Sequence, residues 1–192
     1  MNVPTLKAFE EEIADLFNAG KIPYPVHLES GNEEQLINIF QDIKKNDWIF
    51  GTWRLHLKAL LKGVPRGELK AAIRRGESMA LSFPEHRVFG SAIVGGTISI
   101  ALGVALGIKR DRGSEHVWCF LGDMGAETGI FLESRHYAEA HDLPITFVVE
   151  DNGVSVCTPT KEVYPKRLKP NVIRYKYESK WPHAGAGKRI QF

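Results

Sequence analysis

The sequence has 192 residues, of which 43% are hydrophobic and 25% charged, and its formal net charge is +2. This composition is typical of a globular domain with a buried core, and it excludes an intrinsically disordered chain. The two cysteines, Cys119 and Cys157, are too few for a disulfide framework or a cysteine zinc site. Together with the absence of a secretory signal, they predict a reducing, cytoplasmic location.

Helical spacing of apolar residues predicts four helices in the first half of the chain: 5–19, 30–45, 52–62 and 66–75. Ser30 and Glu33 fit a capping box at the start of the second helix. The proline-containing segment 21–28 is expected to be extended. Residues 76–90 have no clean periodicity, and we interpret them as a loop.

The 18 residues from Ser91 to Ile108 carry no charge, which just reaches the length of a membrane helix. The stretch is rich in glycine, serine and threonine, and its flanks are those of a soluble protein. We therefore predict a buried helix over about 97–109 that covers one face of a sheet. Gly103 and Gly107 would let another helix approach closely, and the alternative is that small residues merely fill a tight core.

Two short apolar runs, 116–121 and 145–150, flank a helix predicted over 129–141. This order has the length of a right-handed crossover, which makes the two strands parallel. The sequence therefore predicts a single α/β domain in which helices flank both faces of a parallel sheet. Its three parts would be an N-terminal helical segment (1–50), a core that carries the candidate site (51–160) and a basic C-terminal segment (161–192).

The charge is unevenly distributed along the chain. Residues 161–192 hold nine Lys or Arg against two Glu, a net charge of +7, so residues 1–160 carry −5. A basic segment can serve nucleic acid, an acidic partner or a phosphorylated ligand, although it is more often a solvated surface. No nucleic-acid-binding motif accompanies it, so we do not expect a nucleic-acid partner.

Polar residues follow the two predicted parallel strands at their carboxyl ends, where ligands bind in open α/β sheets. They form the segments 122–125 (Gly-Asp-Met-Gly) and 151–154 (Asp-Asn-Gly-Val). A carboxylate, a carboxamide and a backbone carbonyl suit Mg²⁺, which shares its coordination shell with phosphates. A helix N-terminus after Gly125 would offer free N–H groups to the same phosphates. The pattern favours a diphosphate bound through Mg²⁺, and the alternative is that Asp123 and Asn152 are ordinary turn residues.

The spacing of these segments resembles that of thiamine diphosphate enzymes, which carry Gly-Asp-Gly, a spacer and then Asn-Asn. Here the spacer between the motifs is 26 residues, 125–150. Residues 151–155 look like the corresponding segment of transketolases. Three segments are similar to the alpha subunit of the decarboxylating component of 2-oxo acid dehydrogenases: 52–56 (its Tyr-Arg-x-His), 93–103 (its Ile-Val-Gly…Ala-x-Gly helix) and 143–145 (its Leu-Pro before a strand). The resemblance covers about residues 24–160.

The resemblance implies roles for individual residues. Asp123 and Asn152 would bind Mg²⁺ through their side chains and Val154 through its carbonyl. The other expected cofactor contacts are the backbone N–H groups of Met124 and Gly125 at the diphosphate, the guanidinium of Arg54 at a phosphate oxygen, and the backbone of Val94 at the aminopyrimidine. His56 is a candidate catalytic residue. The glutamate that activates the cofactor would belong to a partner chain.

Three residues depart from the family pattern. Met124 replaces the last glycine of the first motif, Asp151 replaces the first asparagine of the second, and Ala80 stands where the family has a histidine. The loss of that imidazole puts the acid–base chemistry of the dehydrogenases in doubt. A surface ion pair is an equal alternative for Arg54, and an ordinary structural role is the commoner one for His56.

These observations predict the diphosphate-binding subunit of a two-chain enzyme that depends on thiamine diphosphate and Mg²⁺ and acts on a 2-oxo acid or a ketose. A second subunit with the pyrimidine-binding domain would complete an α2β2 heterotetramer. Transfer of the cleaved fragment to a small carbonyl acceptor, as in a carboligase or transketolase, is the favoured reaction. The alternatives are a dehydrogenase alpha subunit that passes an acyl group to a lipoyl domain, a metal-dependent phosphotransfer or nucleotide-binding enzyme, and a non-catalytic scaffold subunit.

Overall fold

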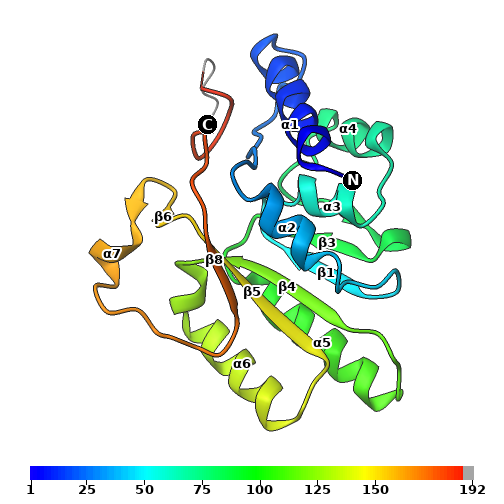
Figure 1. The fold of residues 1–192 in the computed structure, drawn as a ribbon, viewed down its shortest axis with the longest axis vertical. Helices are drawn as coiled ribbons and strands as arrows, with labels where there is room; N and C mark the ends of the chain where they lie inside the picture. Colours follow the sequence, from blue (N-terminus) through cyan, green and yellow to red (C-terminus); the bar gives the residue numbers. More distant parts are fainter. Residues whose placement is uncertain (188–192) are drawn as a thin grey trace.

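The structure, a computed structural model, describes residues 1–187 (Figure 1). Its main sheet has the strand order β2-β3-β1-β4-β5-β8. The strands are β1 (Trp48–Gly51), β2 (Ser82–Phe83), β3 (Val88–Gly90), β4 (Val117–Gly122), β5 (Ile145–Asp151) and β8 (Ile173–Lys176). Only β2 runs antiparallel to its neighbour in this sheet. The predicted α/β fold with a mostly parallel sheet is confirmed.

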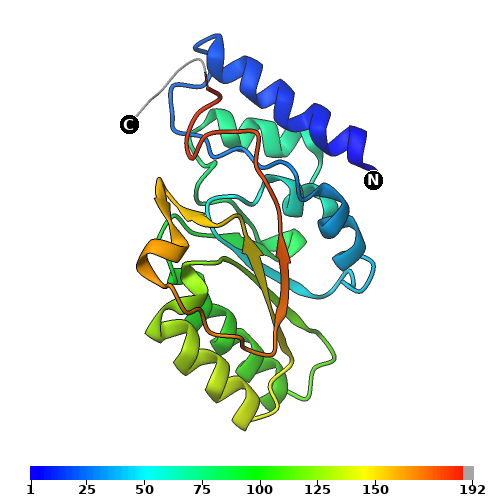
Figure 2. The same cartoon turned by 60° about the vertical axis from the view of Figure 1, so that its left-hand side comes forward.

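Helices cover both faces of this sheet (Figures 1 and 2). They are α1 (Val3–Asn18), α2 (Glu33–Ile39), α3 (His56–Leu61), α4 (Arg66–Arg74), α5 (Gly96–Arg110), α6 (Gly129–Ala140) and the short α7 (Thr160–Val163). Trp118 and Phe120 of β4 pack with α1–α4, whereas Cys119 and Leu121 pack with α5 and α6. Because β4 is buried on both faces, it has the continuous apolar sequence from which it was predicted.

The helices of the first half begin and end partly where the sequence predicts. The helices expected over 5–19 and 66–75 correspond to α1 and α4. The second helix ends at Ile39, earlier than predicted, and Ser30 does not cap it. The Ser30 hydroxyl instead accepts a hydrogen bond from the backbone N–H of Lys180, at 3.0 Å. The helix expected over 52–62 starts only at His56.

Four strands of the sheet were not predicted. Strands β2 and β3, with the 3-10 turn η1 (Pro84–His86) between them, lie inside 76–90, which was interpreted as a loop. They are too short for their periodicity to be recognised. Strand β1 precedes a predicted helix, and β8 lies at the edge of the sheet. In β8, charged residues alternate with apolar ones, so the strand resembles the basic segment around it.

Helix α5 accounts for the uncharged stretch, but only one face of it is buried. Thr97, Ile98, Ala101 and Ala105 pack against the sheet. On another face, an added Cβ at Gly103 or Gly107 would meet no atom within 4 Å. The predicted close helix neighbour is therefore absent from residues 1–187. Within the same residues, no helix is both long and apolar enough to cross a membrane.

The C-terminal segment after β8 returns to the N-terminal segment (Figure 2). The Gly185 N–H donates a hydrogen bond to the Val26 carbonyl at 2.9 Å, and His27 forms a parallel bridge with Gly185. Gly31 has φ +85, and a Cβ there would lie 2.0 Å from the Glu178 carbonyl oxygen. Only glycine allows this close approach of the two backbones.

Candidate cofactor site

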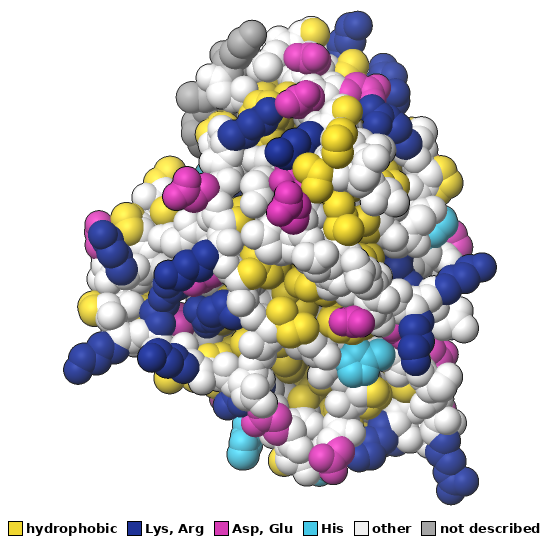
Figure 3. All heavy atoms as spheres, in the orientation of Figure 1, with side chains coloured by type: hydrophobic (Ala, Val, Ile, Leu, Met, Phe, Trp, Pro, Cys, Tyr) yellow, Lys and Arg dark blue, Asp and Glu magenta, His cyan; other side chains and the backbone are white. Residues whose placement is uncertain are grey.

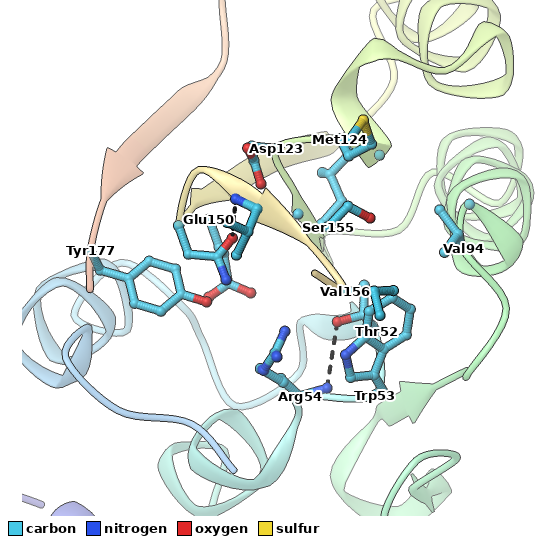
Figure 4. A pocket seen from close by; sticks show the side chains of 16 residues that line it. Thr52, Trp53, Arg54, Val94, Asp123, Met124, Glu150, Ser155, Val156 and Tyr177 are labelled. Atoms are coloured by element: carbon cyan, nitrogen blue, oxygen red, sulfur yellow. Dashed lines mark hydrogen bonds between the residues drawn. The ribbon is translucent and has the colours of Figure 1, made fainter. Parts of the chain in front are cut away.

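A cleft lies at the carboxyl ends of β1, β4 and β5, where loops from distant parts of the sequence meet (Figure 4). The predicted site residues that line it are Arg54, Val94, Asp123, Met124, Gly125, Asn152 and Val154. In Figure 4, Asp123 and Met124 lie on one side of the cleft, and Arg54 and Trp53 lie on the other. The parallel sheet brings these residues together because the strands that precede them end at the same edge.

Asp123 is buried at the end of β4, and burial raises the pKa of its carboxyl. Arg167, from the connection between α7 and β8, places Nη1 3.2 Å from Asp123 Oδ2 and 3.0 Å from Asp151 Oδ2. Arg174 of β8 lies 3.6 Å from the same Asp151 oxygen. We call the carboxylates of Asp123 and Asp151 the acidic end of the cleft. Two arginine side chains of this protein lie against them.

Sequence reasoning missed both arginines of this end, Arg167 and Arg174. The only signal for them was the net charge of the C-terminal segment, and Figure 3 shows a group of Lys and Arg side chains around α7. Lys188 and Arg189 of that segment lie outside the described residues.

The loop after β5 forms two successive side-chain turns. The Gly153 N–H donates to Asp151 Oδ1 at 3.1 Å, and the Val154 N–H donates to Asn152 Oδ1 at 3.3 Å. Gly153 has φ +75, a conformation that glycine adopts without strain. These turns hold the Asn152 amide and the Val154 backbone at the cleft, so the turn role and the ligand role that we considered for Asn152 are compatible.

The loop after β4 differs from the prediction in one respect. Residues Gly125–Glu127 form a 3-10 turn, η2, and α6 begins only at Gly129. The N-terminus of α6 is capped by Thr128, whose hydroxyl accepts from the Phe131 N–H at 3.4 Å. Donors for an anion at this loop therefore come from the turn around Met124 and Gly125, and not from the end of a long helix.

Arg54 projects a positive charge toward the cleft from the loop that follows β1. It donates through Nη2 to the His183 carbonyl at 3.3 Å, and its buried Nε has no hydrogen-bond partner among the described residues. No carboxylate of residues 1–187 forms an ion pair with it. The alternative of a surface ion pair is thus not what the structure shows, and the guanidinium is suited to an anion in the cleft.

His56 does not belong to the cleft, which corrects its interpretation as a catalytic candidate. The side chain is fully buried, with Nδ1 3.1 Å from a Glu10 carboxylate oxygen and Nε2 2.9 Å from Ser78 Oγ. A buried imidazole with both nitrogens bonded cannot contact a substrate. It connects α3 to α1 and to the turn that follows α4.

A buried charge network that the sequence did not indicate lies beneath the cleft. Lys58 Nζ of α3 contacts Glu29 and lies 2.9 Å from Glu150 Oε1, and Glu150 lines the cleft. Burial alone would lower the pKa of Lys58, but the two carboxylates raise it. Asn32 donates to Glu29 Oε1 at 2.9 Å and Tyr175 donates to Glu150, so further hydrogen bonds support the network.

The donor set of the cleft fits a hard cation that shares its ligands with phosphates. Asp123 offers a carboxylate, Asn152 an amide oxygen and Val154 a backbone carbonyl, which is the oxygen chemistry that Mg²⁺ prefers. Residues 1–187 contain no group of three or more His, Cys, Asp or Glu suited to a metal ion. Such a group would suit a site built by protein ligands alone, whereas Mg²⁺ usually needs only one or two carboxylates beside phosphates.

Comparison with known proteins identifies related chains. The model of the Dehydrogenase E1 component family matches residues 1–166. The alpha subunit of acetoin:2,6-dichlorophenolindophenol oxidoreductase from Bacillus subtilis is 30% identical over 164 residues, which cover 80% of this chain and 49% of that protein. The Cupriavidus necator protein of the same name is 32% identical over 165 residues, with coverages of 80% and 49%.

A third relative is named for a different activity. The chloroplastic pyruvate dehydrogenase E1 component subunit alpha-3 of Arabidopsis thaliana is 32% identical over 162 residues, which cover 76% of this chain and 38% of that protein. The chain therefore spans about half, or less, of the length of these relatives.

Proposed function

Because the chain belongs to the dehydrogenase E1 component family, we propose that it binds thiamine diphosphate through Mg²⁺ in the cleft at the carboxyl ends of β1, β4 and β5. One observation carries the proposal. Seven residues expected at the cofactor, drawn from segments up to 100 positions apart, line this one cleft. The sheet places the loops at one edge, but it does not require that each of these seven residues be among those that line the cleft.

Each residue of the cleft has a binding role in this proposal. Asp123, Asn152 and Val154 hold the cation. The turn at Met124 and Gly125 presents backbone N–H groups to the diphosphate, which explains why a methionine is tolerated there. When bound, thiamine diphosphate supplies the electron sink for cleavage of the bond beside a carbonyl group.

Two further residues would orient the cofactor. Arg54 balances the phosphate charge from the opposite side of the cleft, and the backbone of Val94 positions the aminopyrimidine. Both are placed by loops at the edge of the sheet, so their positions depend on the strands that precede them and not on contacts with each other.

We propose that a second subunit completes the site. Large apolar side chains stand exposed near the mouth of the cleft: Ile93 at 70%, Val94 at 53% and Val156 at 55%. Helix α5 also leaves Gly103 and Gly107 open to a neighbour. The relatives are named as alpha subunits, which supports a beta partner. We expect an α2β2 heterotetramer, since closed twofold symmetry is the commonest arrangement.

The reaction that fits best is cleavage of a 2-oxo acid or an α-hydroxyketone, followed by transfer of the fragment in the manner of the dehydrogenases. The relatives named for acetoin and pyruvate support this substrate class. The lost histidine at Ala80 weighed against it in the sequence, but Ala80 does not line the cleft. Transfer to a small carbonyl acceptor remains a second candidate because residues 151–155, of which three line the cleft, resemble transketolases.

The test is to isolate the chain with its native partner and to identify the bound cofactor by mass spectrometry. In a thermal-shift panel with Mg²⁺, thiamine diphosphate should raise the melting temperature and a nucleoside diphosphate should not. The opposite result would favour phosphotransfer, and stabilisation by the partner alone would favour a scaffold subunit.

The purified complex then separates the two reactions. It should be given pyruvate or acetoin together with either a lipoyl domain or an aldehyde. Acylation of the lipoyl domain supports the dehydrogenase, whereas a new carbon–carbon bond supports the carboligase.

A further inference from the structure

Residues 164–172, which we call the strap, connect α7 to β8 and bring a guanidinium to the acidic end of the cleft. Arg167 bridges two carboxylates that are almost fully buried, Asp123 at 1% and Asp151 at 3% exposure. The bridging distances from its Nη1 are 3.2 and 3.0 Å. The Leu168 N–H also donates to Glu127 at 3.1 Å, so the strap is attached twice to acidic residues of this end.

The two bridged carboxylates need a compensating positive charge. Two buried like charges repel each other, and an arginine between them offsets part of this repulsion. Arg167 therefore does for the cation-free chain what a divalent cation would do for the loaded one. It supplies positive charge at Asp123, the residue that the proposed function assigns to the metal.

We propose that Arg167 occupies the position of the divalent cation when the cation is absent, and that the strap must release Arg167 from Asp123 before Mg²⁺ binds. The proposal rests on the proposed function. A Mg²⁺–oxygen bond is about 2.0–2.1 Å long and the ion retains its own waters. A guanidinium 3.2 Å from the same carboxylate would therefore meet this shell and repel the ion. Cation binding and the attachment of Arg167 to Asp123 therefore oppose each other, and each lowers the equilibrium constant of the other by the same factor.

The sequence departure at Asp151 strengthens this link. The family that the chain resembles has asparagine at this position, which offers no charge to an arginine. Here Asp151 gives Arg167 a second carboxylate, and the Arg174 guanidinium lies 3.6 Å from the same carboxylate. An Arg167 paired with one carboxylate would yield to the cation more readily than one paired with two, so Asp151 lowers the affinity for the cation.

The experiment measures Mn²⁺ affinity of the full 192-residue chain by calorimetry, with no cofactor present. Arg167→Gln should bind Mn²⁺ about tenfold more tightly than the parent, the scale on which a close charge pair competes. Lys166→Gln is the matched control, because it removes the same charge from an exposed neighbour that has no ion pair among the described residues. Its affinity should change by less than about twofold because exposed charges are screened.

A second measurement uses the unaltered chain and does not depend on whether a variant folds. Hydrogen exchange of residues 164–172 should become faster when Mn²⁺ is added, because the strap leaves its carboxylates. Equal affinity in the Arg167→Gln and Lys166→Gln variants, or exchange that Mn²⁺ leaves unchanged, would overturn the strap proposal. The proposed metal site would still stand if Asp123→Ala abolished Mn²⁺ binding. A parent chain and an Arg167→Gln chain that both bind no Mn²⁺ would overturn the strap proposal only, because in the proposed function the diphosphate supplies part of the shell of the cation.

Discussion

Two pairs of buried carboxylates lie near the same cleft, and they differ in the element that carries the basic side chain between them. Beneath the cleft, Lys58 of α3 balances Glu29 and Glu150 and is itself fully buried. At the acidic end, Arg167 balances Asp123 and Asp151 but belongs to a connection and is about one-quarter exposed. A basic side chain that is carried by a buried helix, such as Lys58, is a permanent part of the core. A basic side chain that is carried by a connection, such as Arg167, can be replaced by a bound metal ion. The second pair of carboxylates is therefore suited to a ligand, and the first is not.

Removal of the buried Lys58 side chain should have the largest effect on stability. Lys58→Met leaves Glu29 and Glu150 buried without a counter-charge and should lower the free energy of unfolding by about 3–5 kcal/mol. Denaturant unfolding measures this loss. Lys70→Met is the control, since it breaks a half-exposed pair with Glu12 and should cost less than about 1 kcal/mol. Equal losses in the two variants would show that the buried network is no tighter than a surface pair.

Loss of the exchangeable site should affect ligand binding more than the fold. For the assembled protein, thiamine diphosphate with Mg²⁺ at 100 times its dissociation constant should add about 2.7 kcal/mol of stability. Asp123→Ala should abolish this gain, whereas Asp42→Ala, the same change at an exposed position, should preserve it. Thermal unfolding with and without both ligands measures the difference. Full stabilisation of the Asp123→Ala protein would refute the metal assignment.

His27 shows what happens to a buried ionisable group that has no counter-charge. Burial, together with the charges of His183 and Arg54, lowers its pKa to about 3. Its folded pKa lies below the unfolded value, so the unfolded chain binds more protons between about pH 6.5 and 3. Stability from this residue is therefore complete above pH 6.5 and falls as the pH decreases, by at most about 1.4 kcal/mol per unit.

Replacement of His27 tests this pH dependence. Unfolding of His27→Gln should have a flatter pH profile than the parent in the same window. His136→Gln, at an exposed position of α6, should leave the profile unchanged. If the free energy of unfolding has the same pH dependence in His27→Gln and in the parent, His27 titrates alike in the folded and the unfolded chain, and its pKa is not lowered by burial.

The smallest effect on cofactor binding is expected at the hydrogen bond between His56 and Ser78. Ser78→Ala removes one partner of a buried imidazole and should destabilise the fold by about 1–3 kcal/mol at most. Cofactor affinity of the assembled protein should not change, because neither residue lines the cleft. Calorimetric titration of thiamine diphosphate measures this. A loss of affinity without a loss of stability would restore His56 to the site.

The sequence predicts the two longest strands of the sheet, β4 and β5, but not the shorter ones. Strands β4 and β5 were recognised because sheet burial on both faces requires continuous apolar runs. Asp123 and Asn152 follow from the ends of those strands, whereas Arg54 and Val94 came from the family resemblance alone. Strand β8 was missed because it alternates charged and apolar residues at an edge.

The contacts that the sequence could not predict join distant residues. Arg167 reaches Asp123 across 44 positions, and Glu10 reaches His56 across 46. No local pattern records such separations, so the charge of the C-terminal segment was visible but its target was not. His56 became a candidate through the resemblance of 52–56 to a family segment, and that local match could not show that its partners lie on α1 and in the turn after α4.

The close approach of Gly31 to Glu178 has a consequence for the order of folding. Val26 and His27 pair with Gly185, and Gly31 lies against the Glu178 carbonyl, so this segment depends on residues that emerge from the ribosome much later. Closing so long a loop is entropically costly, and contacts of high sequence separation slow the search for the native state. The segment between α1 and α2 therefore waits, incompletely paired, until the chain beyond β8 has been synthesised.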